Sequence, residues 1–356
     1  MILPTTVSTV WILAIVALVC LGSWANTLKL AGKWRFEFFY FNFVFGILLS
    51  AGAAAFLLGS ARPQELTFQD NLLLVGYRKI AWALGSGVEL NLGILLLLAA
   101  MTLSGMSVAF PLALGVALVI GTVWDFATAA QANAALTWGG VVLLLAAMAV
   151  IALAHVWRLQ QEQEAGQTAL RADPRVKTKR PKPPGGALAI IFAVIAGIAL
   201  SMFPRILGEA TDGENAMASY SAVLLLAVSA LVTSPFFVLY FITFPLAGTA
   251  ASPGRYSAGS AKQHLLGVAG GILWGAGMLS SLLVAQAPRE AQPSAGIQYA
   301  LNQLLNGAAL LVDAAWGLLA WREFRGAGHR VQMLVVGMVV LFLAGLGVVG
   351  FAFAAK

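Results

Sequence analysis

Ten long apolar segments constrain this chain more than any other feature. About 20 apolar residues cross a bilayer core of roughly 30 Å. Ten segments reach that length: residues 5–25, 37–59, 79–101, 104–126, 135–157, 185–205, 216–246, 265–287, 297–321 and 331–354. Charged residues make up 10% of the chain, against about 25% in soluble domains. Because lipid offers the backbone no hydrogen-bond partners, such segments form helices. The sequence therefore predicts an all-α membrane protein with ten transmembrane helices.

The positions of Lys and Arg predict the orientation of these helices. If the N-terminus lies outside, cytoplasmic loops hold fifteen of the 21 basic residues: Lys29, Lys33, Arg35, seven residues within 158–182, Arg255, Lys262, Arg322, Arg325 and Arg330. Cytoplasmic loops of membrane proteins are enriched in Lys and Arg. We therefore expect both termini outside, in a multi-pass protein of the inner cell membrane. The same loops, beside anionic lipid, account for the net charge of +7, so no nucleic-acid partner is expected.

The chain also repeats itself at an offset of 192 residues. Five pairs of identical residues coincide at this offset: Trp82 with Trp274, Gly85 with Gly277, Gly115 with Gly307, Leu118 with Leu310, and Trp124 with Trp316. Five spans precede the polar, basic segment 159–184 and five follow it. Because five is odd, the second copy enters the membrane in the opposite orientation, as in the inverted repeats of secondary transporters. We expect two five-helix repeats, 1–158 and 185–356, joined by a cytoplasmic linker, 159–184.

Glu89 is the most unusual polar residue because it lies in the middle of the third span. A carboxylate at the bilayer centre costs about 2.5–3.5 kcal/mol on insertion scales. Such a group is expected to face the interior of the bundle, where its protonation can be coupled to solute binding. The alternative is a neutral or paired Glu that only fixes helix packing. Its mate in the repeat is Ser281, so the two halves differ chemically at this depth.

The ninth span carries a polar stripe. Residues three or four apart share one face of a helix, and this spacing relates Tyr299, Asn302, Asn306, Leu310 and Asp313, with Gln303 beside them. Successive amides suit a polar solute, but Asn and Gln also bond neighbouring helices to each other. Asp313 lies nearer the cytoplasmic end. We expect it either to act at the solute site, as a ligand or in proton coupling, or to pair with a local basic group.

Three further candidates for solute binding lie in the first two spans. Tyr40 and Asn42 begin the second span, and Trp24 ends the first. Trp24 is either an anchor at the membrane interface or a wall on which a solute stacks. Asp125 and Arg205 lie at span ends, where charged side chains reach water at little cost.

Small residues predict one close helix contact. Gly267, Gly271 and Gly275 form two consecutive GxxxG steps on the eighth span. This pattern brings helix backbones together in membranes, so we assign it to packing.

No enzyme motif is visible in the sequence. It has no HExxH, no phosphate-binding P-loop and no Ser/His/Asp arrangement. Cys20 is the single cysteine, which excludes a disulfide framework and a cysteine-based metal cluster. We therefore expect neither an enzyme nor a bound metal or cofactor.

Several segments resemble those of ureide permeases. They are QDN (69–71), GVELNLG (87–93) and VIGTVWDF (119–126), with GSWANTL ending the first span, FYFNF opening the second, AGGILWGAG in the eighth and AWGLLAWREFR at the end of the ninth. The chain is similar, more distantly, to glucose/ribose porters and the L-rhamnose–proton symporter family. All belong to the drug/metabolite transporter superfamily, whose members have ten spans in a five-plus-five inverted repeat.

The resemblance implies proton-coupled movement of a small polar metabolite: a ureide, a nucleobase or a sugar. Asn42 stands where the family motif has Asp, and Glu89 occupies an apolar position of another motif. These departures would move the proton site from the second span to the third.

The leading hypothesis is a proton-coupled importer of a small polar solute that works as a monomer or homodimer. Glu89 would be the protonatable switch, and the amides of the ninth span would be ligands. One alternative is an exporter of drugs or metabolites, in which the apolar lining of the fourth and eighth spans matters more. Another is a membrane scaffold or sensor whose basic linker binds lipid or a partner.

Overall fold

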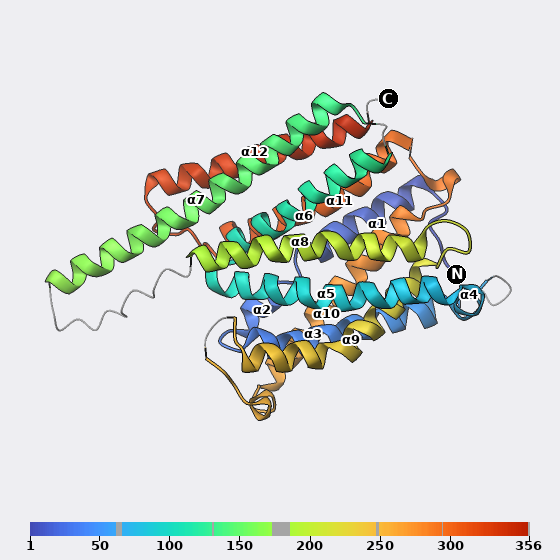
Figure 1. Cartoon of the computed structure of the whole chain (residues 1–356), viewed down its shortest axis with the longest axis horizontal. Coiled ribbons are helices and arrows are strands. Elements are labelled where there is room, and N and C mark those ends of the chain that lie inside the picture. Colours follow the sequence, from blue (N-terminus) through green and yellow to red (C-terminus); the bar gives the residue numbers. More distant parts are fainter. Residues whose placement is uncertain (62–65, 130–131, 173–185, 247–248, 294, 355–356) are drawn as a thin grey trace.

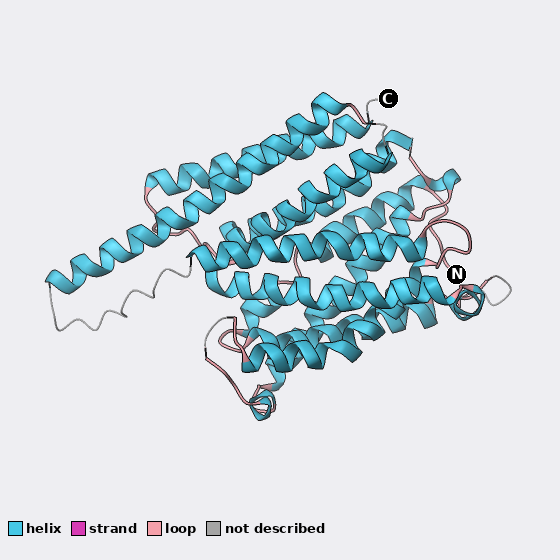
Figure 2. Ribbon diagram, in the orientation of Figure 1, coloured by secondary structure: helices cyan, strands magenta, loops and turns pink. Residues whose placement is uncertain are grey.

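The structure is a computed structural model that describes the chain except residues 62–65, 130–131, 173–185, 247–248, 294 and 355–356. The described residues form helices and loops without a β-strand (Figure 2). The helices are α1 (Val7–Leu21), α2 (Asn26–Ala31), α3 (Phe36–Leu57), α4 (Phe68–Leu74), α5 (Tyr77–Ser104), α6 (Met106–Ala129), α7 (Ala134–Ala172), α8 (Gly186–Thr211), α9 (Ser219–Thr243), α10 (Ala261–Ala285), α11 (Ala295–Ala315) and α12 (His329–Ala354). Short turns are η1 (Pro253–Tyr256), η2 (Arg289–Ala291) and the π-helical η3 (Trp316–Ala320).

Nine helices in the described part of the chain are long and apolar enough to cross a membrane. The first of them joins α1 and α2, and the others are α3, α5, α6, α7, α8, α9, α10 and α12. The ninth expected span, 297–321, falls on α11 and η3, where Gly307–Ala320 forms a shorter apolar helix. The prediction of an all-α membrane protein is therefore confirmed.

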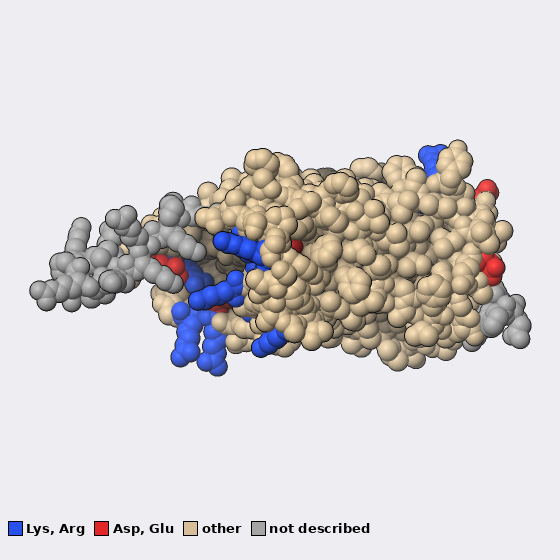
Figure 3. All heavy atoms as spheres, turned by 90° about the horizontal axis from the view of Figure 1, so that it is seen from below, with Lys and Arg blue, Asp and Glu red and all other residues tan. Residues whose placement is uncertain are grey.

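The long helices lie side by side in one bundle (Figure 1). The start of α1 and the end of α12 lie at one end of it, which we call the terminal end. The end of α7 and the start of α8 lie at the opposite end, which we call the linker end. On the face drawn in Figure 3, Lys and Arg gather mainly at the linker end.

Helices from before and after the linker are interleaved rather than separate. Helix α5 packs against α8 and α9, and α10 packs against α1 and α3. In addition, α6 contacts α11, α3 contacts α9 and α7 contacts α12. The core is thus formed jointly by both parts of the chain.

The glycines of α10 make one of the closest of these contacts. A Cβ atom on Gly271 would lie 1.8 Å from the carbonyl oxygen of Phe43, and one on Gly46 would lie 2.1 Å from that of Val268. Because both obstacles are backbone atoms, a side chain at either position would force α3 and α10 apart. The assignment of the GxxxG steps to packing is confirmed.

Candidate functional site

A cavity of about 390 Å³ lies in the middle of the bundle. Its described lining comes from α1, α5 and α6 before the linker and from α8, α10 and α11 after it, together with Trp24. The lining reaches Asp125, Arg205 and Ala285, which lie near the ends of α6, α8 and α10 at the terminal end. The cavity therefore extends from the centre of the bundle towards the terminal end.

Aromatic side chains form much of the cavity wall. Trp24 and Phe110 have ring centroids 6.0 Å apart, and Phe203 and Trp274 have centroids 6.2 Å apart. All four residues line the cavity. Such rings stack on flat solutes, and an indole N–H can also donate a hydrogen bond. The predicted stacking residue Trp24 thus lies in the cavity wall. Trp274 lies in the same wall; the repeat pairs it with Trp82, but the sequence did not predict it as a binding residue.

The terminal end of the cavity is charged. Arg205 of α8 donates a hydrogen bond to the carboxylate of Asp125 on α6 and a second one, of 2.8 Å, to the carbonyl oxygen of Gly121. Its guanidinium also lies 5.9 Å from the ring centroid of Trp124. The sequence suggested that these charges sit at span ends in contact with water. The structure instead pairs them across two helices in the cavity wall.

Glu89 does not belong to the described lining of this cavity. It shares a face of α5 with Gly85 and Gly93, each one turn away. Cβ atoms on those glycines would contact Ile206 and Leu200 of α8. The half-buried Glu89 residue therefore lies on the side of α5 that packs against α8, beside the cavity wall.

Tyr40 belongs to a network that joins three helices. Its hydroxyl donates a 2.6 Å hydrogen bond to the side-chain oxygen of Asn91 on α5. The Asn91 amide in turn donates to the Ala230 carbonyl at 3.2 Å and to the Thr233 hydroxyl at 2.7 Å, both on α9. The polar side-chain atoms of Tyr40 and Asn91 thus have partners, and neither residue lines the cavity.

Asn42 lies in a separate network nearer the linker end. Its amide donates to the Phe38 carbonyl at 3.0 Å, and its oxygen accepts a 2.9 Å hydrogen bond from the Tyr256 hydroxyl. Nδ1 of His264 lies 3.3 Å from the same oxygen. The structure thus places Tyr40 and Asn42 in contacts between helices, away from the cavity and from each other.

We expect Tyr40→Phe to lower the stability of the protein without weakening solute binding. The substitution leaves a buried acceptor, the Asn91 oxygen, without its donor, which costs about 1–3 kcal/mol. Thermal unfolding of the purified protein would measure this loss, with Tyr240→Phe, on an exposed surface, as the control. Weaker solute binding at an unchanged unfolding temperature would instead restore Tyr40 as a ligand.

The polar stripe of the ninth span lies on α11. The side chains of Tyr299, Asn302, Gln303 and Asn306 are outside the described part of the structure. Asp313, one turn before η3, is fully buried, and its two carboxyl oxygens have no hydrogen-bond partner among the described residues. An ionised carboxylate in that position would be costly. Of the two predicted proton-coupling residues, Asp313 is therefore the more deeply buried.

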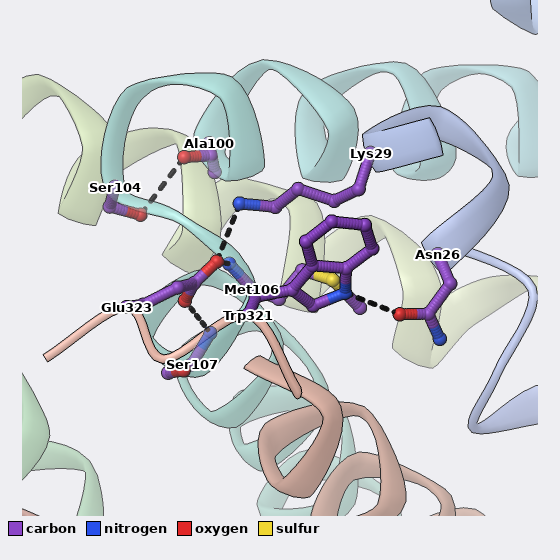
Figure 4. Close-up of polar contacts among 8 residues, drawn as sticks. All are labelled: Asn26, Lys29, Ala100, Ser104, Met106, Ser107, Trp321 and Glu323. Atoms are coloured by element: carbon purple, nitrogen blue, oxygen red, sulfur yellow. Dashed lines mark hydrogen bonds and ion pairs between the residues drawn. The ribbon is translucent and has the colours of Figure 1, made fainter. Parts of the chain in front are cut away.

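A charged cluster lies where α5 ends and α6 begins (Figure 4). Lys29 of α2 and Glu323, which follows η3, form an ion pair of 2.6 Å. The same carboxylate accepts hydrogen bonds from the backbone N–H groups of Met106 at 2.9 Å and Ser107 at 2.8 Å, so that it caps the first turn of α6. Gly105, with φ of +90°, turns the chain at this point, and a Cβ there would lie 2.7 Å from the Glu323 carboxylate.

Burial raises the pKa of the Glu323 carboxyl, but its neighbours reverse this effect. The Lys29 ammonium and the N–H groups of Ser107 and Met106 lower the pKa by more, so that it lies below the usual value of a glutamic acid. Nearby, the indole N–H of Trp321 donates a 2.6 Å hydrogen bond to the Asn26 side chain. We call Lys29, Glu323, Trp321, Asn26 and the first turn of α6 the linker-end cluster.

The linker-end cluster joins α2, α6 and the segment after η3. It lies one helical turn from the cavity, on the side of the linker end. Met106 and Phe110 lie one helical turn apart on α6, the first in the cluster and the second in the cavity wall. A second cavity of about 230 Å³ adjoins Lys29 and Glu323 and is also lined by His155. This arrangement can seal one side of the central cavity while the other side extends towards the terminal end.

These features define a helical membrane protein with a cavity shared by two parts of the chain. Comparison with curated proteins finds similarity to two permeases of Arabidopsis thaliana. The chain is 23% identical to ureide permease 4 and 21% identical to ureide permease 1, with 94% of this chain and of each relative covered. No family model and no solved structure matches it. The similarity, which spans nearly the whole chain, supports a ureide permease-like membrane transporter.

Proposed function

We propose that the chain is a secondary transporter that carries a small polar organic solute through the central cavity by alternating access. The observation that carries this proposal is a cavity of about 390 Å³ walled by helices from both sides of the linker. Transporters built from two repeats bind their substrates in such a place. The similarity to ureide permeases over 94% of the chain supports the same function.

The pattern of helix contacts supports a five-plus-five inverted repeat. If α1, α3, α5, α6 and α7 correspond to α8, α9, α10, α11 and α12, the most extensive contacts have mates: α5 with α8 matches α10 with α1, and α5 with α9 matches α10 with α3. The contacts of α6 with α11 and α7 with α12 are then their own mates. The basic linker end would face the cytoplasm of an inner membrane, with both termini outside.

We infer that transport is coupled to protons through Asp313, with Glu89 as the second candidate. Asp313 is buried without a described partner, so it is stable there mainly as the neutral acid. A conformational change that exposes it to water would release the proton. The solute classes that the similarity suggests are ureides, nucleobases and sugars, and no chemical conversion of the solute is proposed.

The test is uptake of allantoin, uracil and glucose by proteoliposomes under an imposed pH gradient. We expect the gradient to drive accumulation of at least one of them. In Asp313→Asn, accumulation should fall to the level measured without a gradient, while exchange of solute across the membrane at equal pH continues. If Asp313→Asn still accumulates solute and Glu89→Gln does not, Glu89 carries the proton. If the pH gradient causes no solute accumulation with the parent protein or with either variant, the proposal of proton coupling is wrong.

One observation favours a second candidate, an exporter of the same general type. Most of the described cavity lining is apolar and aromatic, contributed largely by α6, α8 and α10. This wall suits flat apolar compounds as well as polar ones. Binding measurements separate the two functions, because an exporter would bind lipophilic cations and the proposed transporter would bind uncharged polar solutes.

A further inference from the structure

Two charged side chains stand out in the wall of the central cavity. Of its described lining residues, Asp125 and Arg205 are the ones with ionisable side chains. They come from α6 and α8, on opposite sides of the linker, and their side chains are 15% and 32% exposed. The pair faces a cavity whose other described walls are mainly apolar, so a polar solute that enters from the terminal end meets it first.

A tie between two helices does not by itself explain this placement. Removing two charges from water costs several kcal/mol per ion, and their attraction often only offsets that cost. A pair of apolar side chains would join α6 and α8 at least as well. The pair is also held in one orientation, because Arg205 donates to the Gly121 carbonyl at 2.8 Å and lies over the Trp124 ring. A fixed orientation of the Arg205 side chain is more important for recognising a solute than for joining α6 to α8.

The chemistry of the pair defines what it can bind. A guanidinium has five N–H donors, of which the bonds to Asp125 and Gly121 use two. A carboxylate accepts up to about four hydrogen bonds in total, so Asp125 can accept one from a solute while it keeps its other partners. The pair thus presents a donor and an acceptor side by side. Trp24 and Trp274 provide aromatic surfaces in the same cavity.

We propose that Asp125 and Arg205 form the polar subsite that selects the solute. Arg205 donates to a carbonyl oxygen, and Asp125 accepts from an adjacent N–H on the same edge of a flat, uncharged solute, which stacks against the indoles. A charged solute is disfavoured, because it would compete for one member of the pair and leave the other, partly buried charge uncompensated. This inference rests on the proposed function, since it names the polar contact of the same cavity.

The first test compares two probes of nearly the same shape. Uracil has N–H groups beside its carbonyl groups, and 1,3-dimethyluracil keeps the ring and the carbonyls but has no N–H. Isothermal titration calorimetry of the purified full-length protein should show that uracil binds about 10- to 100-fold more tightly, which is the effect of one hydrogen bond to a charged group. Equal affinity for the two probes would overturn the proposal.

The second test separates recognition from simple attachment of the helices. Asp125→Asn and Arg205→Lys should each weaken uracil binding about tenfold or more. The double exchange Asp125→Arg with Arg205→Asp restores an ion pair but swaps donor and acceptor. We expect it to recover the thermal unfolding temperature and not the affinity. Recovery of both would show that the pair only joins α6 and α8. The exposed residues Glu214 and Arg78 provide the matched controls Glu214→Gln and Arg78→Lys.

The outcomes also distinguish this proposal from the proposed function. If allantoin or glucose is transported, and Asp125→Asn and Arg205→Lys leave its affinity unchanged, transport stands and the subsite is wrong. If no polar solute binds or crosses the membrane in any variant, both fall. Tighter binding of uracil than of 1,3-dimethyluracil, lost in both single variants, supports the subsite.

Discussion

Gly271→Ala is expected to unfold at a much lower temperature than the parent protein and to lose solute transport. The new Cβ would lie 1.8 Å from the Phe43 carbonyl oxygen and 2.8 Å from the Ile47 nitrogen. Both are backbone atoms of α3, so no side-chain rotation relieves the overlap, and the helices must separate. Overpacking of this kind costs about 1–3 kcal/mol and at times more, and we expect a value near the upper end.

The same displacement reaches the cavity. Trp274 lies three residues beyond Gly271 on α10 and forms part of the cavity wall. Thermal unfolding and size-exclusion profiles in detergent would measure the loss of folded protein, and uptake assays would measure transport. Gly52→Ala is the matched control, because Gly52 is on α3 and a Cβ added there would have no atom within 4 Å. Ala is favoured over Gly in helices by up to about 1 kcal/mol. An unfolding temperature equal to that of Gly52→Ala would contradict the tight packing of α3 and α10.

Glu323→Gln is expected to have the second largest effect, because one carboxylate holds three groups. The substitution keeps the shape but removes the charge that pairs with Lys29 and caps the N–H groups of Met106 and Ser107. The Glu323 side chain is 8% exposed and that of Lys29 is 27% exposed. Loss of one partner of a buried pair costs about 3–5 kcal/mol. Partial exposure of Lys29 places our expectation at about 3 kcal/mol.

The pH dependence of this effect has a definite sign. The folded-state pKa of Glu323 is lowered, so its ionised form stabilises the fold at neutral pH. That stabilisation is lost as the pH falls below the unfolded value of about 4.3 and through the lower folded-state pKa. The difference in unfolding temperature between the parent protein and Glu323→Gln should therefore be large at pH 7 and shrink in acid.

Glu214→Gln, at an exposed position, is the control for this experiment. A constant difference between the parent protein and Glu323→Gln from pH 7 to pH 3 would show that the charge of Glu323 does not stabilise the linker-end cluster. If the cluster also seals the linker side of the cavity, Glu323→Gln should increase labelling of Ser104→Cys, a buried position beside the second cavity, by a water-soluble thiol reagent in a Cys20→Ala background.

The membrane-spanning helices could be predicted from the sequence because hydrophobicity is a local property. Each apolar run carries its own information on length, and nine runs in the described part of the chain became membrane-length helices. The close contact made by Gly271 was also predictable, since the GxxxG spacing places small residues on one face. Trp24 was selected because it ends a span beside a polar turn, and the structure places it in the cavity wall.

Polar partners were much harder to predict, because they are far apart along the chain. Asp125 and Arg205 are separated by 80 positions, and Lys29 and Glu323 by 294. Taken singly, each charge lies at a span end and suggests contact with water. Tyr40 was predicted to be a ligand because it is polar in an apolar span. Its hydroxyl instead donates to Asn91, whose amide in turn donates to the Ala230 carbonyl on α9. Periodicity shows which face of a helix a side chain occupies but not which helix it meets.

The sequence by itself determined that the chain crosses the membrane repeatedly as helices, since the cost of exposing backbone and charge to lipid allows little else. It also identified Glu89 and Asp313 as carboxyl groups that are costly to place in an apolar span. The tertiary structure alone decided which of these groups meet. Hydrogen bonds and ion pairs act over a few ångströms, so their partners are known only when the helices are packed. The Asp125–Arg205 pair in the cavity wall and the Lys29–Glu323 pair in the linker-end cluster are examples.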